Sequence, residues 1–373
     1  MVESSEHIID TSSPFRVREL DKKWNHILLR TASIAPVEAD RLSIWFDRSP
    51  DIFLIPKLTS NSYKCGGLFS DSELLGFAIA TFQKRYLYGH LSEVMYLGNM
   101  HVTRAGRGKH FLYHMSDFFF KDLPPGVEYI YGYVVEKNPA AMDLVRRIGF
   151  RAKIMGQIAM ANIFLLLPIK QSTKYSIRKA TTADIDQIVS LLQEHYSGMF
   201  LAPEINHVNF IKNLNQRPNF DVGNYFLALS GSEVIGVCSA WDMTAFKKNR
   251  ILRYDRSTAF RRQIYNLAAP LLGAAQLPAA GQPIKDITIA EYALKNRDPK
   301  IMDALLRHIY RHYRKAGYQS LIFGADINDP LLKATKHFLK SLVRSNVIMG
   351  SIQPEKVSQL KKPSLIYTDT IQI

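Results

Sequence analysis

The chain has 373 residues, a length that fits two domains of ordinary size better than one. Hydrophobic residues make up 47% of it and charged residues 22%, a globular composition that argues against extensive disorder. The formal net charge of +15 favours an anionic partner, but charge alone does not choose among nucleic acid, acidic lipid, acidic protein and a phosphorylated cofactor.

The cysteines and the apolar runs bear on where the protein works. Cys65 and Cys238 lie too far apart in the sequence to suggest a disulfide framework or a metal-ligand cluster, so we expect a reducing compartment and no metal. No apolar run approaches the roughly 20 residues that cross a bilayer. The polar, acidic start of the chain does not resemble a signal peptide. These features predict a cytoplasmic protein without a membrane span.

The hydrophobic pattern of the first half predicts alternating strands and helices. In chain order they are a strand at 15–20, a helix at 23–34, hairpin strands at 62–69 and 74–82, a strand at 94–102, a helix at 108–120, a strand at 129–135, a helix at 140–148 and closing strands within 150–167. The polar segment 169–175 is the best linker. This order is typical of an α/β fold with a mixed sheet of the α+β kind.

Two short patterns recur at one spacing, which indicates an internal repeat. Residues 16–18 (RVR) match 176–178 (SIR), and 73–77 (ELLGF) match 233–237 (EVIGV), each 160 residues later. A third match, Asn138-Pro139 with 328–330 (NDP), is 190 residues apart, so about thirty extra residues are expected in the second copy, around 242–285. We therefore expect an N-terminal domain at 14–168 and a C-terminal domain at 175–373.

A basic, glycine-containing turn separates the predicted strand 94–102 from the helix 108–120. Amides at a helix start point outward at the positive end of the helix dipole, where a pyrophosphate can bind. Gly106 and Gly108 allow close backbone approach, and Arg104, Arg107 and Lys109 add positive charge. Such a turn is also compatible with a plain connection.

A second motif follows one strand later and makes a family recognisable. Together the two motifs resemble those of the GNAT acetyltransferase superfamily. Val102 and Arg107-Gly108-Lys109 match its pyrophosphate loop, and Asn138, Ala141, Leu144, Gly149 and Phe150 match the helix that follows in that family. The resemblance implies two GNAT-like acyl-CoA N-acyltransferase domains in tandem, with the cofactor chemistry in the first.

The resemblance also implies a co-substrate, acetyl-CoA or another acyl-CoA, and the residues that bind it. The amides from Arg107 to Leu112 would bind the pyrophosphate, strand residues 100–102 would pair with the pantetheine arm, and Asn138 would contact the cofactor near its thioester. The cofactor-binding residues expected on this basis are Met100, His101, Val102, Arg107, Gly108, Lys109, His110, Phe111, Leu112, Asn138 and Ala141.

The sequence departs from the family pattern at three positions. His110 and Leu112 stand where the family usually has Gly and Gly or Ala, which predicts a tighter loop. Val145 stands where many members have a Tyr that protonates the leaving thiolate, so another group or water would have that role here.

Attack of an amine on a thioester requires a base and a donor that polarises the carbonyl. Strand alternation predicts that Tyr96, Gly98, Met100 and Val102 share one face and that Met95, Leu97, Asn99 and His101 share the other. Several acetyltransferases have a glutamate base where Tyr96 stands, and Glu93 is the nearest carboxylate. Glu93 and Tyr96 are therefore the candidate catalytic residues, while His101 is expected to have a structural side chain.

The second copy lacks the cofactor signature. Between the predicted strand 287–294 and helix 301–316, Asp298 would cap the helix and Pro299 would remove an amide, which disfavours phosphate. The 242–285 insertion mixes basic and aromatic residues, namely Lys247, Lys248, Arg250, Arg253, Arg256, Arg261 and Arg262 with Phe246, Tyr254, Phe260 and Tyr265. These could bind nucleic acid, but no nucleic-acid motif is present, and a surface amphipathic helix is favoured.

The function predicted from the sequence is N-acetyl transfer, or transfer of another acyl group, from acyl-CoA to a primary amine of a small molecule or peptide by direct attack. One alternative is a catalytically silent acyl-CoA-binding or nucleic-acid-associated module. Another is an aminoacyl or long-chain acyl transferase of the tandem GNAT type, which donor preference would distinguish. The acceptor does not follow from the sequence.

Overall fold

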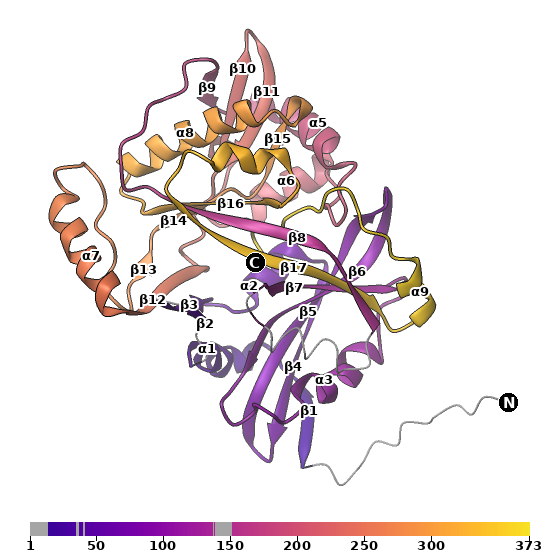
Figure 1. The fold of residues 1–373 in the computed structure, drawn as a ribbon. Helices are drawn as coiled ribbons and strands as arrows, with labels where there is room; N and C mark the ends of the chain where they lie inside the picture. The colour runs from indigo at the N-terminus through magenta and orange to yellow at the C-terminus, as the bar shows by residue number, and fades with distance from the viewer. Residues whose placement is uncertain (1–13, 35–36, 40–41, 137, 139–150) are drawn as a thin grey trace.

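The computed structural model describes residues 14–34, 37–39, 42–136, 138 and 151–373 (Figure 1). Its first half comprises β1 Phe15–Glu19, α1 Asn25–Ser33, β2 Val37–Ala39, β3 Leu42–Asp47, α2 Leu54–Thr59, β4 Ser62–Ser70, β5 Glu73–Leu87, β6 His90–Val102, α3 Phe111–Phe120, β7 Tyr129–Val135 and β8 Arg151–Phe164. Its second half comprises β9 Ser176–Lys179, α5 Ile185–Tyr196, α6 His207–Gln216, β10 Tyr225–Ser230, β11 Glu233–Ser239, β12 Lys248–Tyr254, α7 Arg256–Ala268, β13 Pro283–Ile284, β14 Asp286–Thr288, β15 Tyr292–Leu294, α8 Pro299–Lys315, β16 Ser320–Asp326, β17 Lys340–Ser351 and α9 Pro354–Gln359.

The same strand arrangement occurs twice. In the first half β1, β4, β5 and β6 are antiparallel neighbours, and in the second half β9, β10, β11 and β15 follow the same order. β6 then pairs in parallel with β7, as β14 pairs in parallel with β16. The mixed α/β architecture predicted from the sequence is confirmed, and the two halves repeat it.

The closing strands are exchanged between the two halves. β17, from the end of the second half, pairs with β7 of the first, while β8 of the first pairs with β16 of the second. β8 and β17 pair with each other in between, so one nine-stranded sheet runs through both halves in the order β1-β4-β5-β6-β7-β17-β8-β16-β14 (Figure 1). Each half therefore completes the other half's sheet, which the division at 168 and 175 did not foresee.

Helices cover both faces of the first half's part of this sheet. α3 packs on one face, where Met115 contacts a cluster that includes Ala80 of β5. α1 lies on the other face, where Leu28 belongs to a cluster with Phe77 of β5. Because side chains alternate along a strand, these two clusters divide the residues of β5 and β6 between the α3 face and the α1 face.

Local chemistry explains where α8 begins and ends. Asp298 caps the helix by accepting a hydrogen bond from the Lys300 amide at 2.8 Å, and Pro299 occupies the first turn, which needs no amide donor. The helix ends before Gly317, whose φ of 81° suits glycine. The prediction of a helix at 301–316 therefore lies within two residues of the observed bounds.

The insertion in the second half contacts the first half. Its strand β12 pairs with β3, and Arg250 Nε lies 2.7 Å from Asp47 Oδ2 in an ion pair between the halves. Phe246 is buried in the core. Since several of its basic and aromatic residues serve these internal contacts, only α7 of the insertion is the surface helix that the sequence suggested.

Candidate functional site

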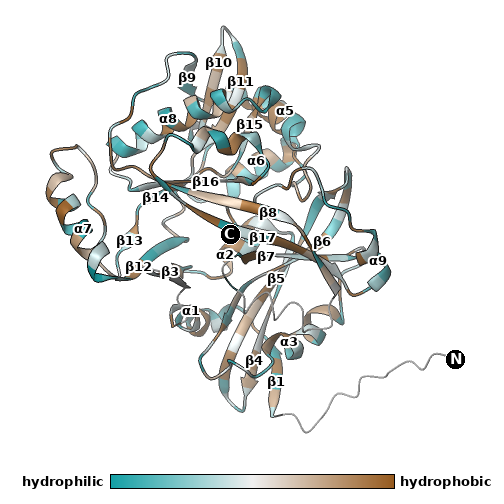
Figure 2. Cartoon of the chain, viewed as in Figure 1, coloured by the Kyte–Doolittle hydropathy of each residue, from teal (hydrophilic) through white to brown (hydrophobic). Residues whose placement is uncertain are grey.

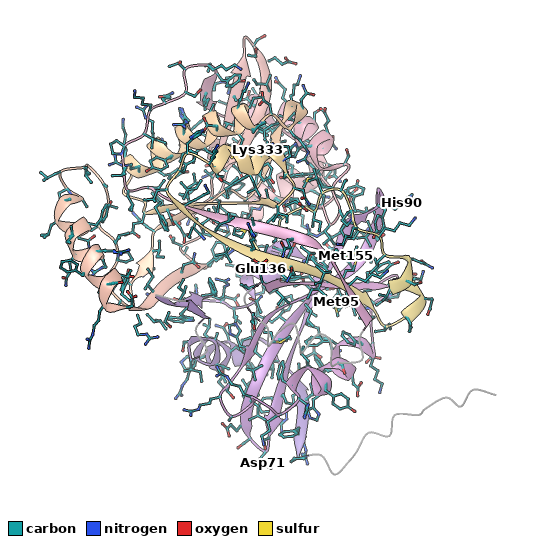
Figure 3. The ribbon with its side chains drawn as sticks, in the orientation of Figure 1. Asp71, His90, Met95, Glu136, Met155 and Lys333 are labelled. Atoms are coloured by element: carbon teal, nitrogen blue, oxygen red, sulfur yellow. The ribbon has the colours of Figure 1, made fainter. Side chains whose placement is uncertain are left out.

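β6 and β7 pair over a short stretch and then separate. Residues 94–96 pair in parallel with 129–131, around Met95, which Figure 3 labels. Beyond that stretch, in the described part of the chain, β6 remains paired with β5 while its other edge from 97 to 102 has no strand partner. A Cβ on Gly132 of β7 would stand 3.0 Å from the Leu97 carbonyl oxygen, so the strands are still close there. The open edge of β6 begins at this point.

A β-bulge lies just past the start of the opening. Gly98 pairs with Ile79 and His101 pairs with Phe77, so Asn99 and its neighbour together oppose a single residue of β5. Asn99 has φ of 47°, in the left-handed region that Asn tolerates better than most residues. The bulge shifts the alternation of every residue after it.

This shift makes the predicted face assignment of Met100, Val102 and His101 wrong. Met100 and Val102 pack in the α3 cluster, whereas His101 stacks on Phe77 with ring centroids 5.1 Å apart, on the same face as Tyr96. Burial, with the nearby Arg48 cation second, lowers the pKa of His101 to about 4. The imidazole is therefore neutral near pH 7.

The turn between β6 and α3 is folded back on the strand. The amide and the hydroxyl of Thr103 each donate to the Leu75 carbonyl oxygen at 2.9 Å. A Cβ on Gly106 would stand 2.3 Å from that same oxygen, so glycine is required there. The Arg107 and Lys109 amides donate within the turn, at 3.4 and 3.2 Å, and are not free for a ligand as the sequence suggested.

The start of α3 retains unpaired donors. Among the described residues, the amides of Gly108, His110, Phe111 and Leu112 have no acceptor. Such amides carry the partial positive charge of the helix terminus. The side chains of Arg107 and Lys109 are exposed beside them. This end of α3 can therefore accept an anionic group.

His110 adopts a strained conformation at the helix N-cap. Its φ of 51° and ψ of 40° are left-handed, a region that costs a residue other than glycine roughly 1–2 kcal/mol. Glycine adopts this conformation without that cost. The backbone at His110 therefore suits glycine, and the His110 side chain makes no capping hydrogen bond to offset the strain.

We expect His110→Gly to raise the free energy of unfolding by about 0.5–1 kcal/mol, since relief of the strain exceeds the added chain entropy of glycine. The control is Lys109→Gly, because Lys109 has no positive φ and gains nothing from glycine. Urea unfolding measures both. Equal destabilisation by the two variants would contradict the strain argument.

Three tyrosines gather where β6 and β7 separate. The ring centroid of Tyr96 lies 5.1 Å from that of Tyr131 and 5.7 Å from that of Tyr133. An added Cβ on Gly98 would stand 2.5 Å from the Tyr96 hydroxyl, so the phenol extends along β6 over this glycine. Burial raises the pKa of Tyr131 to about 12 and raises the pKa of Tyr96 as well, so both are neutral phenols.

The second catalytic candidate, Glu93, lies on the other face. Glu93 pairs across the strands with Lys84, and their side chains form an ion pair at 3.9 Å. Its Cγ lies 3.8 Å from where a Cβ on Gly126 would be, in the segment that leads from α3 to β7. The structure therefore does not bring Glu93 and Tyr96 together.

Arg48 adds a buried positive charge to the Tyr96 face. It is 8% exposed, and its Nη1 has no hydrogen-bond partner among the described residues. Burial lowers the pKa of Arg48 to about 10, while Tyr96, Asp47 and Asp286 act to raise it. A buried donor without a partner next to the opening is a feature that a bound ligand explains.

A buried polar network joins β5 to residues 368–373, which cross between the halves. Arg85 Nη2 donates to Asp369 Oδ2 at 2.7 Å, and Gln372 Nε2 donates to the same oxygen at 2.7 Å. Gln83 bridges to the tyrosines, because its Oε1 accepts from the Tyr131 hydroxyl at 2.8 Å. All of these side chains are buried.

A cavity of about 310 Å³ opens onto this network between α2 and α6. Gln83, Arg85 and Asp369 form part of its wall, together with the buried pair of Arg217 and Glu291, which are 2.7 Å apart. Its size is that of a small-ligand pocket. Gln83 therefore lies between the cavity, whose wall it joins, and Tyr131, whose hydroxyl it accepts a hydrogen bond from.

Sequence reasoning missed Gln83, Arg85, Arg48 and Asp369. They belong to no motif, and the fold brings them together from opposite ends of the chain. The only sequence signal for these four residues was their polarity within apolar runs. The same pattern also fits a strand with one solvent-exposed face. Asn138 follows β7, with its amide bound to the Val135 carbonyl oxygen at 2.9 Å, while Ala141, Val145 and the helix predicted at 140–148 lie outside the described residues.

Membrane-spanning helices and metal-ligand groups are both absent from the described residues. Within residues 14–34, 37–39, 42–136, 138 and 151–373, no helix is long and apolar enough to cross a membrane. The same residues contain no group of three or more His, Cys, Asp or Glu side chains arranged to hold a metal ion.

Comparison with solved structures places this fold among known ones. Saccharomyces cerevisiae N-myristoyltransferase with bound myristoyl-CoA is similar, with a TM-score of 0.60 and 13% identity over 98% of this chain and 88% of that one. A GCN5-related N-acetyltransferase from Sphaerobacter thermophilus has a TM-score of 0.54 and 13% identity over 91% of this chain and 96% of that one. No protein-family model and no curated protein sequence matches the chain. The chain thus has a GNAT-like fold in two tandem copies, as the resemblance implied.

Proposed function

We propose that the protein is an acyl-CoA-dependent N-acyltransferase that transfers an acetyl or other short acyl group directly to a primary amine. The observation that carries this proposal is the open edge of β6, which leads from Tyr96 to the unpaired amides at the start of α3. An acyl-CoA has a thioester at one end of an extended arm and a pyrophosphate toward the other. The end of the open edge at Tyr96 can interact with the thioester, and the end at the start of α3 can bind the pyrophosphate.

The first half would hold the cofactor. The pyrophosphate binds the unpaired amides of Gly108, His110, Phe111 and Leu112, and the exposed Arg107 and Lys109 side chains pair with its charges. The pantetheine arm pairs with the edge at residues 100–102, and Asn138, just past β7, remains the proposed contact near the thioester. The second half lacks this arrangement, because Asp298 already caps the corresponding helix.

The Tyr96 face would carry the chemistry. The neutral amine attacks the thioester carbonyl carbon, a C–N bond forms, the C–S bond breaks, and the sulfur leaves as a thiolate. Arg48 stabilises the negative charge that develops on the carbonyl oxygen. Tyr96, a neutral phenol, donates a hydrogen bond to the leaving sulfur and supplies its proton, the role that the missing family tyrosine would have had. The neutral His101 accepts the proton that the amine loses. Because its pKa is about 4, the imidazolium gives this proton up through solvent to the Tyr96 phenolate, so both side chains return to their neutral forms.

The acceptor would enter through the cavity between α2 and α6. Glu204 contributes a carboxylate to its wall, which suits a primary amine, and Asn209 and Asn213 add hydrogen-bonding groups, beside Lys57, Lys84 and Lys212. The polar wall and the tyrosines around the opening favour a short donor chain over a long one, since a long chain requires an apolar tunnel. The acceptor class proposed is a small-molecule or peptide amine.

We expect the protein to release free CoA from acetyl-CoA when primary amines are present, and Tyr96→Phe to lower kcat about a hundredfold with little change in the KM for acetyl-CoA. The matched control is Tyr113→Phe on α3, whose ring is 62% exposed. A thiol assay over a panel of small amines and peptides measures both.

The alternatives give different results in this assay. Binding of acetyl-CoA without turnover against any amine would leave a silent acyl-CoA-binding module. Turnover only with long-chain acyl-CoA, or only with aminoacyl-tRNA, would assign the donor to those classes. Equal kcat for Tyr96→Phe and wild type would remove the proposed role of Tyr96 while leaving the transferase intact.

A further inference from the structure

α7 exposes an apolar stripe along one side. Phe260, Ile264, Leu267 and Leu271 are 62%, 53%, 81% and 91% exposed. Their spacing of four, three and four residues places them on one face of the helix and of the turn that follows it. Large apolar side chains as exposed as these rarely lie next to one another on a protein surface. Such a patch typically marks an interaction surface.

The opposite side of α7 is fixed to the protein. Arg262 Nε donates to the Pro278 carbonyl oxygen at 2.7 Å, and the Tyr265 hydroxyl donates to the Ala275 carbonyl oxygen at 3.2 Å. The Tyr254 hydroxyl also donates to Pro278, at 2.9 Å. These contacts hold the helix with its apolar stripe turned outward. In Figures 1 and 2, α7 projects from the body of the molecule with apolar positions along it.

The charges around the stripe are of one sign. Residues 256–284 contain no Asp, Glu or Lys and carry only Arg256, Arg261 and Arg262. Arg256 and Arg261 are exposed, at the start of the helix and on the flank of the stripe. The whole chain carries a net charge of +15. A surface that complements the stripe must therefore be apolar inside and negatively charged at its boundary.

We propose that α7 docks onto an anionic lipid bilayer surface, with Phe260, Ile264, Leu267 and Leu271 inserted into the headgroup and acyl boundary. The arginines then lie at the level of the phosphate and serine groups. Interfacial helices bind membranes through such a combination of an apolar face and flanking basic residues. The site is separate from the one that we propose for acyl transfer, so either can hold without the other.

The test is co-sedimentation of the full chain with vesicles of phosphatidylcholine containing about a third phosphatidylserine. We expect wild type to bind, Leu267→Asp with Leu271→Asp to reduce binding on the order of tenfold or more, and higher salt to weaken it. Val208→Asp on α6 is the matched control, because Val208 is also a helical apolar residue, 75% exposed. Circular dichroism of the variants verifies that they remain folded.

A second measurement reports insertion itself. Phe260→Trp is expected to shift its emission to shorter wavelength with the anionic vesicles and to be quenched by brominated acyl chains. No binding by wild type, or equal binding by the double aspartate variant, would overturn the proposal. So would a lipid-free dimer that this variant converts to monomer, since the stripe would then be an interface between two copies of the chain. Binding to RNA that the same variant abolishes would overturn it too.

Discussion

Reversing two charges at the start of α3, by Arg107→Glu with Lys109→Glu, is expected to weaken acetyl-CoA binding about a hundredfold. Each side chain is exposed beside the unpaired amides of the helix terminus and would make a charge-assisted contact with phosphate. A contact of this kind contributes roughly 1.5–3 kcal/mol, and about 1.4 kcal/mol corresponds to tenfold in Kd. Isothermal titration of acetyl-CoA at fixed salt measures the change.

The matched control is Lys22→Glu with Lys23→Glu, which changes the net charge equally. Lys22 and Lys23 are exposed just before α1, on the face of the sheet opposite to α3. The control variant should bind acetyl-CoA within about twofold of wild type, because exposed charges beyond a Debye length are largely screened. Equal losses in both variants would indicate bulk electrostatics rather than a site at α3.

The secondary structure of the first half could be predicted because its strands each have one clearly apolar face. Strand alternation placed β4 and β7 within one residue and the start of β5, which runs five residues beyond its predicted end, whereas β2, β3 and α2 were not predicted. Asp71, with φ of 51° in the turn between β4 and β5, matches the hairpin that Ser70, Asp71 and Ser72 suggested. The repeat could be found because the matched segments are the corresponding strands β1 with β9 and β5 with β11. These features depend only on local pattern and spacing.

The exchange of β8 and β17 could not be predicted in this way. β8 is flanked by strands on both sides and reads simply as a buried apolar run, which does not tell which strands are its neighbours. Pairing of β17 with β7 and of β8 with β16 is a choice between two nearly equivalent partners. Only the three-dimensional structure distinguishes the exchanged arrangement from two separate sheets.

Only the part of the candidate site that is local in sequence could be predicted. The turn at 103–110 is local in sequence, so its residues could be named, but the bulge at Asn99 reversed the faces of the residues behind it. A bulge depends on the backbone conformation of a single residue. Asn tolerates that conformation, but an Asn within a strand does not by itself predict a bulge. The network around Arg85 depends instead on a contact between residues 284 positions apart, which no local pattern carries.

Asp369→Ala is expected to lower the free energy of unfolding by roughly 3–5 kcal/mol, because it leaves the Arg85 guanidinium buried without its partner. The side chains of Arg85 and Asp369 are 5% and 6% exposed and 2.7 Å apart. The carboxylate also accepts from Gln372, so its loss leaves two buried donors unsatisfied. Urea unfolding at neutral pH measures the loss.

The double variant Arg85→Met with Asp369→Leu tests whether the lost stability comes from the unpaired charge or from the lost packing of the side chain. Removing both ions leaves no buried charge, and apolar side chains of similar size keep the packing, so most of the lost stability should return. Residues 368–373 join the two halves at this point, so the single variant should also loosen the cavity wall and weaken the acceptor step. A single variant that costs under about 1 kcal/mol would show that water enters and solvates Arg85, and that the pair does not hold the two halves together.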